Sequence, residues 1–95
     1  MPGTIEVKFY GLLRRHARKT AVEIAGDDMT VLALLGRAEE RTGQGFVAEL
    51  LDQERGLLTG TIILINGDNI RLRQGLETRV AAGDRVDLFS PAGGG

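Results

Sequence analysis

The stretch GDRVDLFSPAGGG, residues 83–95, joins an alternating strand to a run of three glycines. Apolar residues occupy every second position, as in a strand that turns one face toward a core. We therefore predict a final strand at residues 85–89, in which Asp87 and Phe89 point outward. After Phe89 the composition changes abruptly to small, uncharged residues.

Similar patterns upstream predict the other strands of a sheet. Residues 5–10 alternate so that Phe9 points inward and Tyr10 outward, and residues 61–65 form an unbroken β-branched and aliphatic run. The remaining predicted strands lie at residues 21–24 and, as a short return after the Asn66-Gly67 turn, at residues 70–72.

One helix is clearly marked between these strands. Thr30 is a suitable N-cap and Gly43 a suitable C-cap, and apolar residues recur between them at helical spacing. Residues 46–51 are a candidate short second helix, whereas the basic segment 12–19 is predicted to be a turn or hairpin connection.

Length and composition fit one small domain. The chain has 95 residues and a net charge of −1, which argues against a general nucleic-acid binder. It has no cysteine, which excludes disulfides, thiolate metal sites and cysteine nucleophiles and favours a cytoplasmic location. The first residues do not resemble a signal peptide, and no apolar run is long enough to span a membrane.

These elements predict an α+β domain over residues 1–89, with a mixed sheet of four to five strands and a helix on one face. Residues 90–95 are expected to form a flexible glycine-rich tail. Glycine lets a backbone fit a narrow channel, and a terminal carboxylate becomes an acyl donor once ATP has adenylated it. Composition alone favours a passive disordered end or an expression scar, because glycine-rich ends are common linkers.

The face of the sheet away from the helix is a candidate binding surface. Tyr10 and Phe89 are both predicted there, and the run 62–65 must place aliphatic residues beside them. An apolar patch of this kind marks a protein partner site. The competing interpretation is that residues 44–60 cover this face.

Other polar residues offer little for catalysis. His16 is the lone histidine, with no carboxylate paired to it in the sequence pattern, and is expected to be exposed. The carboxylates of Asp27, Asp28 and Asp84 lack metal spacing, so no metal site is predicted. A basic cluster is either a solvated surface or a docking site for an acidic partner; it consists of Arg14, Arg15, Arg18 and Lys19.

Several of these motifs together resemble the MoaD/ThiS sulfur carriers. The ending LFSPAGGG resembles the family's F-P-P-v-a-G-G ending, and IEVKFYGLLR at residues 5–14 resembles its first strand. Ile65-Asn66-Gly67 and Gly83-Asp84-Arg85-Val86 match its V-N-G and G-D-E-V turns. Two departures are the third glycine and Ser90, which replaces the first proline.

The resemblance implies a ubiquitin-like β-grasp fold and a sulfur carrier that is not itself an enzyme. Gly95 would be adenylated and converted to a thiocarboxylate, while Gly93 and Gly94 thread a partner's channel. Tyr10, Phe89 and Ile70 are expected at the partner interface.

The implied partners are a ubiquitin-activating-type adenylating enzyme that uses ATP, a sulfur donor and a downstream synthase large subunit. No cofactor is expected on the carrier itself. The chain length favours the molybdopterin or tungstopterin pathway. A ubiquitin-like modifier joined to lysines through Gly95 is the first alternative, and a β-grasp binding module that does not use its tail is the second.

Overall fold

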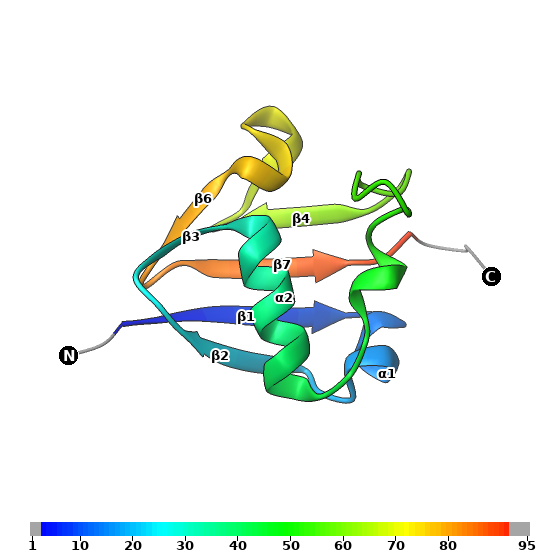
Figure 1. The fold of residues 1–95 in the computed structure, drawn as a ribbon, viewed down its shortest axis with the longest axis horizontal. Helices are drawn as coiled ribbons and strands as arrows, with labels where there is room; N and C mark the ends of the chain where they lie inside the picture. Colours follow the sequence, from blue (N-terminus) through cyan, green and yellow to red (C-terminus); the bar gives the residue numbers. More distant parts are fainter. Residues whose placement is uncertain (1–2, 92–95) are drawn as a thin grey trace.

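A computed structural model describes residues 3–91 of the chain, and its ribbon is shown in Figure 1. A mixed sheet and one main helix dominate the fold. The strands are β1 (Thr4–Tyr10), β2 (Ala21–Ala25), β3 (Asp28–Thr30), β4 (Ile62–Ile65), β5 (Asp68–Asn69), β6 (Arg79–Ala81) and β7 (Arg85–Phe89). The helices are α1 (Leu13–Ala17) and α2 (Val31–Thr42), with 3-10 turns η1 (Val47–Glu49), η2 (Ile70–Leu72) and η3 (Gly75–Glu77).

The main sheet has five strands in the order β2-β1-β7-β4-β5. Its centre is a parallel pair, in which the first strand, β1, lies beside the last strand, β7. The outer pairings are antiparallel. The prediction of a mixed sheet with one main helix is therefore confirmed, and the chain leaves β7 from the middle of the sheet.

Helix α2 begins and ends where its capping residues predict. The Thr30 hydroxyl accepts a 3.1 Å hydrogen bond from the Ala33 N–H, and Gly43 has a left-handed φ of 70°. Four residues of α2 are buried against the sheet: Val31, Leu34, Leu35 and Ala38. The helix crosses one face of the sheet at a steep angle (Figure 1).

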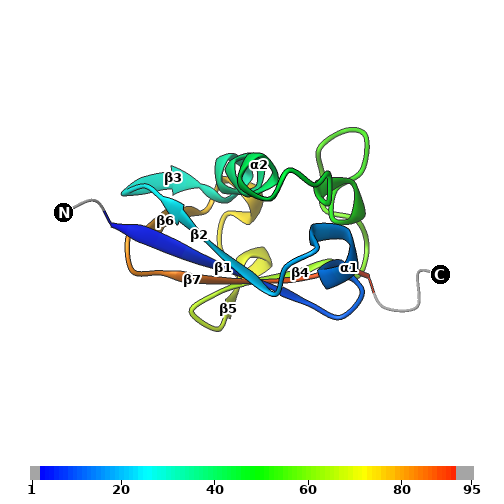
Figure 2. The same cartoon turned by 90° about the horizontal axis from the view of Figure 1, so that it is seen from below.

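The segment after α2 completes the core on the same side. Phe46 is fully buried, and its ring meets the ring of Phe9 edge to face at a centroid distance of 4.9 Å. Figure 2 shows α2 and the region around η1 on one side of the main sheet. The opposite face is thus not covered by residues 44–60, contrary to the competing interpretation.

One local prediction is wrong and two are incomplete. Segment 12–19 connects the antiparallel strands β1 and β2 of a hairpin, as predicted, but it also contains the short helix α1, because Leu13 and Ala17, one turn apart, both bury into the core. Residues 70–72 form η2 rather than a strand, because the Asn69 side chain accepts from the Arg71 N–H and turns the chain. The returning strand is β5, and residues 46–51 form only the single turn η1.

A second, two-stranded sheet was not predicted. It pairs β3 with β6 in antiparallel register, next to the start of α2. Each strand has only three residues, so the sequence carries too few alternations to reveal them. Within residues 3–91, no helix is long and apolar enough to cross a membrane.

Candidate partner-binding face

Two aromatic rings mark the uncovered face of the sheet. Tyr10 and Phe89 are direct partners across the parallel β1–β7 pair. Their rings stack with centroids 4.5 Å apart and an angle of 11° between planes. Such a pair adds about 1 kcal/mol beyond its buried area. Both residues remain half-buried, so the stacked rings are accessible to a partner.

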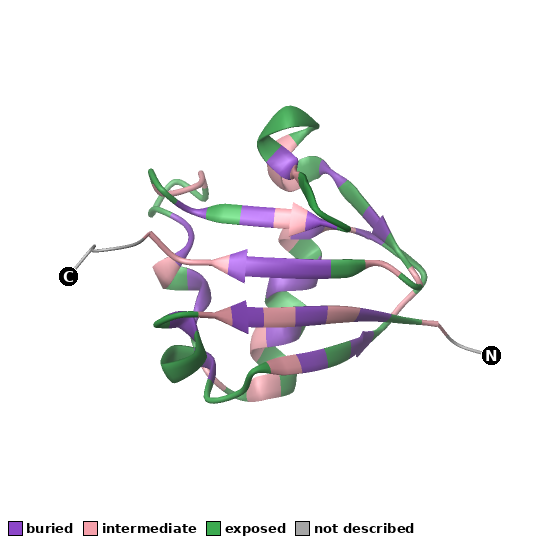
Figure 3. Cartoon of the chain, turned by 180° about the vertical axis from the view of Figure 1, so that it is seen from behind, coloured by how far each residue is buried: buried purple, intermediate pink, exposed green. Residues whose placement is uncertain are grey.

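Aliphatic side chains of β4 extend this aromatic surface. Ile62 is the cross-strand partner of Phe89 and is 42% exposed, and Leu64 on the same side of β4 is half-buried. Together Tyr10, Phe89, Ile62 and Leu64 form what we call the aromatic face. Figure 3, seen from this side, shows buried and more exposed positions alternating along β1 and β4, whereas the middle of β7 is buried throughout. The predicted apolar patch is therefore present.

Asp87 lies beneath the edge of the aromatic face. The alternation places it on the outward side, yet it is only 4% exposed. The Tyr10 hydroxyl donates a 2.9 Å hydrogen bond to its Oδ1, and Arg85 Nε lies 3.3 Å from its Oδ2. A buried carboxylate is tolerated only with such partners. The sequence analysis did not predict that Asp87 is a buried acceptor for Tyr10 and Arg85. The one signal in the sequence was an acidic residue between Arg85 and Phe89.

Two cationic side chains lie near the Tyr10 ring. Lys8 Nζ and Arg14 Cζ each lie 6.0 Å from its centroid, at the outer limit of cation–π contact. Arg14 is held in place because its Nε donates a 3.2 Å hydrogen bond to the Phe9 carbonyl. Of the predicted basic cluster, Arg14 therefore borders the aromatic face. Arg15, Arg18 and Lys19 are exposed farther along the same segment.

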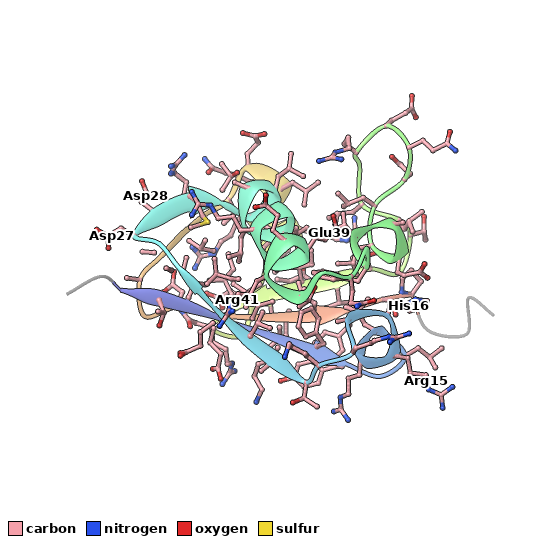
Figure 4. The ribbon with its side chains drawn as sticks, turned by 60° about the horizontal axis from the view of Figure 1, so that its bottom comes forward. Arg15, His16, Asp27, Asp28, Glu39 and Arg41 are labelled. Carbon is pink, nitrogen blue, oxygen red and sulfur yellow. The ribbon has the colours of Figure 1, made fainter. Side chains whose placement is uncertain are left out.

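His16 has a partner that the sequence did not predict. Its Nε2 lies 3.5 Å from Glu49 Oε1, and both side chains are exposed. Figure 4 shows His16 on α1, at the end of the molecule opposite Asp27 and Asp28. The contact links α1 to η1, and no second carboxylate or nucleophile joins it among the contacts of residues 3–91.

The root of the tail leaves the sheet beside the aromatic face. Ser90 and Pro91 are half-buried and line a groove whose other walls include Leu12 and Leu58. Pro91 lies against the backbone at Gly60. The predicted reactive and threading residues, Gly93, Gly94 and Gly95, lie outside the described residues.

Ile70 does not belong to this face. It is fully buried in η2, where it packs into the hydrophobic core. Its predicted place at a partner interface is wrong. Residues 70–72 form a 3-10 turn rather than the expected short strand, and this turn directs the Ile70 side chain inward.

The predicted turn acid Asp28 takes part in an ion pair remote from the aromatic face. Arg79 donates to both carboxylate oxygens of Asp28, at 3.0 and 3.2 Å, across the β3–β6 pair. These hydrogen bonds hold the pKa of Asp28 below its usual value and raise the pKa of Arg79. Both side chains are exposed, so the pair is a surface contact. Within residues 3–91, no group of three or more potential metal ligands occurs.

Comparison with known proteins places the chain in a family. The model of the ThiS family matches residues 7–95. A protein from Archaeoglobus fulgidus that bears the provisional name of sulfur carrier protein is 32% identical over 74 residues, which are 78% of this chain and 83% of that protein.

Solved structures confirm the ubiquitin-like β-grasp fold. A chain of the BexX/CysO complex from Amycolatopsis orientalis has a TM-score of 0.80 and 29% identity, with 96% of this chain and 99% of that chain covered. SAMP1 from Haloferax volcanii has a TM-score of 0.78 and 26% identity, with 98% of this chain and 100% of that chain covered.

Proposed function

This chain belongs to the ThiS family of small ubiquitin-like sulfur carriers, and on that basis we propose that the carboxylate of Gly95 is the group that carries sulfur. The observation that supports this most directly is the position of the aromatic face. The Tyr10–Phe89 stack lies at the end of β7, immediately before the tail. A partner that binds this face is thereby placed next to the chain's C-terminal segment.

The proposed reaction has two steps on the carrier. The Gly95 carboxylate attacks the α-phosphorus of ATP, which forms an acyl adenylate and releases pyrophosphate. Sulfide, supplied by a sulfur donor, then attacks the acyl carbon; the C–S bond forms, the C–O bond to AMP breaks, and a thiocarboxylate and a proton result. The carrier contributes the acyl group, and the adenylating enzyme contributes the catalytic groups.

We further propose the partners and the destination of the sulfur. The aromatic face docks on a ubiquitin-activating-type adenylating enzyme in the cytoplasm, and Gly93 and Gly94 pass through its channel. A synthase large subunit then takes the sulfur for a pterin cofactor of the molybdopterin or tungstopterin type, and hydrolysis restores the carboxylate. The chain itself holds no cofactor in this scheme, and ATP binds to the partner.

A protein modifier is the second candidate, and the similarity to SAMP1, a small archaeal modifier protein, favours it. In that case a lysine amine of a target, rather than sulfide, attacks the same acyl adenylate. An amide forms, and AMP and a proton are released. The two functions therefore share the first step and differ in the nucleophile.

Intact-mass measurement distinguishes the two functions. The full chain is incubated with its cognate adenylating enzyme, ATP and sulfide, and again with a lysate in place of sulfide. Replacement of one C-terminal oxygen by sulfur supports the carrier, whereas ATP-dependent conjugates on other proteins support the modifier. The adenylating enzyme is first shown to be active on another carrier. If that active enzyme then gives no ATP-dependent product with this chain in either incubation, both functions are refuted. A chain that lacks Gly94 and Gly95 is the negative control.

A further inference from the structure

The turn at residues 58–61 is held firmly from two sides, and we call it the tail shelf. The Leu58 N–H and the Thr61 hydroxyl each donate a 2.9 Å hydrogen bond to the Leu50 carbonyl. From the other side, the Arg71 guanidinium donates to the Leu58 and Thr61 carbonyls at 3.2 and 3.5 Å. Thr61, the residue before β4, is buried. The tail shelf is thus rigidly attached to the core.

Pro91 rests on this shelf at Gly60. A Cβ atom placed on Gly60 would lie 3.2 Å from Pro91 Cβ, closer than ordinary van der Waals contact, and 3.4 Å from Pro91 Cα. Gly60 also has a φ of +93°, a backbone conformation that residues other than glycine rarely adopt. The Pro91 ring therefore packs against the backbone of Gly60, which has no side chain to displace it.

We propose that the tail shelf fixes the direction in which the chain leaves β7, so that Gly60 and Pro91 are positioning residues for the reaction at Gly95. The effect on the reaction at Gly95 rests on the proposed function, whereas the contact between Gly60 and Pro91 does not. The docked partner recognises the aromatic face, and the shelf sets where the tail begins relative to that face.

An error in the direction of the chain at Pro91 changes where the tail delivers its terminal carboxylate. When the partner's channel holds the four residues after Pro91 extended, they span about 14 Å, so an error in direction at Pro91 displaces the carboxylate within that channel by ångströms. Misplacement by about 1 Å can slow a reaction by about 100-fold. Proline has a fixed φ, so contact between its ring and a rigid shelf constrains the outgoing backbone directly.

Two alanine variants with nearly equal φ separate this role from simple backbone strain. Gly60 and Gly67 lie at opposite ends of β4 with φ of +93° and +91°, but no atom lies within 4 Å of a Cβ placed on Gly67. We expect Gly60→Ala to lower kcat for adenylation by about 10- to 100-fold with little change in KM, because the aromatic face is intact. Gly67→Ala should keep the wild-type kcat. Equal losses in the two variants would overturn the proposal.

Pro91→Gly tests the other half of the contact. If the shelf guides the tail, Pro91→Gly alone lowers kcat, and the double variant with Gly60→Ala is no worse than the poorer single variant. If Gly60→Ala merely creates a clash, Pro91→Gly alone keeps the wild-type kcat and restores it in the double variant. That second pattern contradicts the proposal.

An NMR measurement on the free protein keeps the inference separate from the proposed function. We expect nuclear Overhauser contacts between the Gly60 α-protons and the Pro91 ring in the wild type and in Gly67→Ala, and their loss in Gly60→Ala. If the wild type shows these contacts but is never adenylated, the proposed function fails and the shelf stands as a structural guide. Absence of the contacts in an adenylated wild type overturns the shelf alone.

Discussion

The phenolic hydroxyl of Tyr10 donates a 2.9 Å hydrogen bond to Asp87, two residues before the Phe89 ring on which Tyr10 stacks. One side chain of β1 is thus attached to β7 at two points, by its ring and by its hydroxyl. Arg85 holds the other oxygen of the same carboxylate. The hydrogen bond from Tyr10 to Asp87 therefore orients the Tyr10 ring so that it stacks on Phe89.

Tyr10→Phe should destabilise the fold by about 1 to 3 kcal/mol, because Asp87 Oδ1 would remain buried without its donor. The stack on Phe89 would remain. Urea unfolding of Tyr10→Phe, Asp87→Ala and the double variant measures the coupling between the two residues. Strictly additive losses would show that the hydrogen bond contributes no stability.

Phe89→Ala should weaken binding of the adenylating enzyme by about 30-fold or more, as expected when a central aromatic contact of about 2 kcal/mol is lost. The matched control is Leu72→Ala, which removes an apolar side chain that is 87% exposed and lies outside the aromatic face. Calorimetric titration of both variants checks the prediction, and circular dichroism verifies that each is folded. Equal weakening by Leu72→Ala would place the binding surface elsewhere.

The cations beside Tyr10 should make binding sensitive to salt. Lys8→Gln removes one of them without removing a hydrogen bond of the described structure, so we expect a slower association rate and a weaker dependence of that rate on ionic strength. Arg41→Gln is the control, since Arg41 is exposed on α2, on the other side of the sheet (Figure 4). Stopped-flow association rates at several salt concentrations measure both effects.

The Asp28–Arg79 pair should give a small acid-dependent contribution to stability. Because Arg79 lowers the pKa of Asp28 in the folded state, the contribution is present above the unfolded pKa and is lost as pH falls through the folded pKa. Asp28→Asn should flatten this acid limb, while stability at neutral pH changes little because the pair is solvated. An NMR titration of the Asp28 carboxyl that gives an ordinary or raised pKa would contradict this.

Removal of Gly95 alone should sharply reduce adenylation, because the new terminal carboxylate would fall about 3.5 Å short. Unfolding free energy should not change, since the described core ends with β7. Chemical denaturation and pyrophosphate release test the two halves of this prediction. Full activity of the shortened chain would mean that the third glycine is dispensable.

Local sequence signals predicted the elements that position the site. The alternation at residues 85–89 gave β7 with its bounds, and Thr30 and Gly43 marked the ends of α2. These signals depend on neighbours in the chain, so they could be read directly. The burial of Asp87 could not be predicted in this way, because it depends on a hydrogen bond from Tyr10, which is 77 residues away in the sequence.

The errors have the same physical origin. Ile70 was expected at the partner interface from the family resemblance, whereas the Asn69 cap starts a 3-10 turn that buries it. Strands β3 and β6 are stabilised by pairing with each other across 51 residues, through Asp28 and Arg79 among others. Neither segment has a pattern of its own that predicts this.

The central position of β7 also bears on protein synthesis. Both neighbours of β7 in the sheet, β1 and β4, emerge from the ribosome before it, and neither is joined to the other until it arrives. A nascent chain released before residue 89 would lack both the strand that unites the sheet and one ring of the stack. A partner that binds the Tyr10–Phe89 pair would therefore not bind prematurely terminated chains, which lack Phe89.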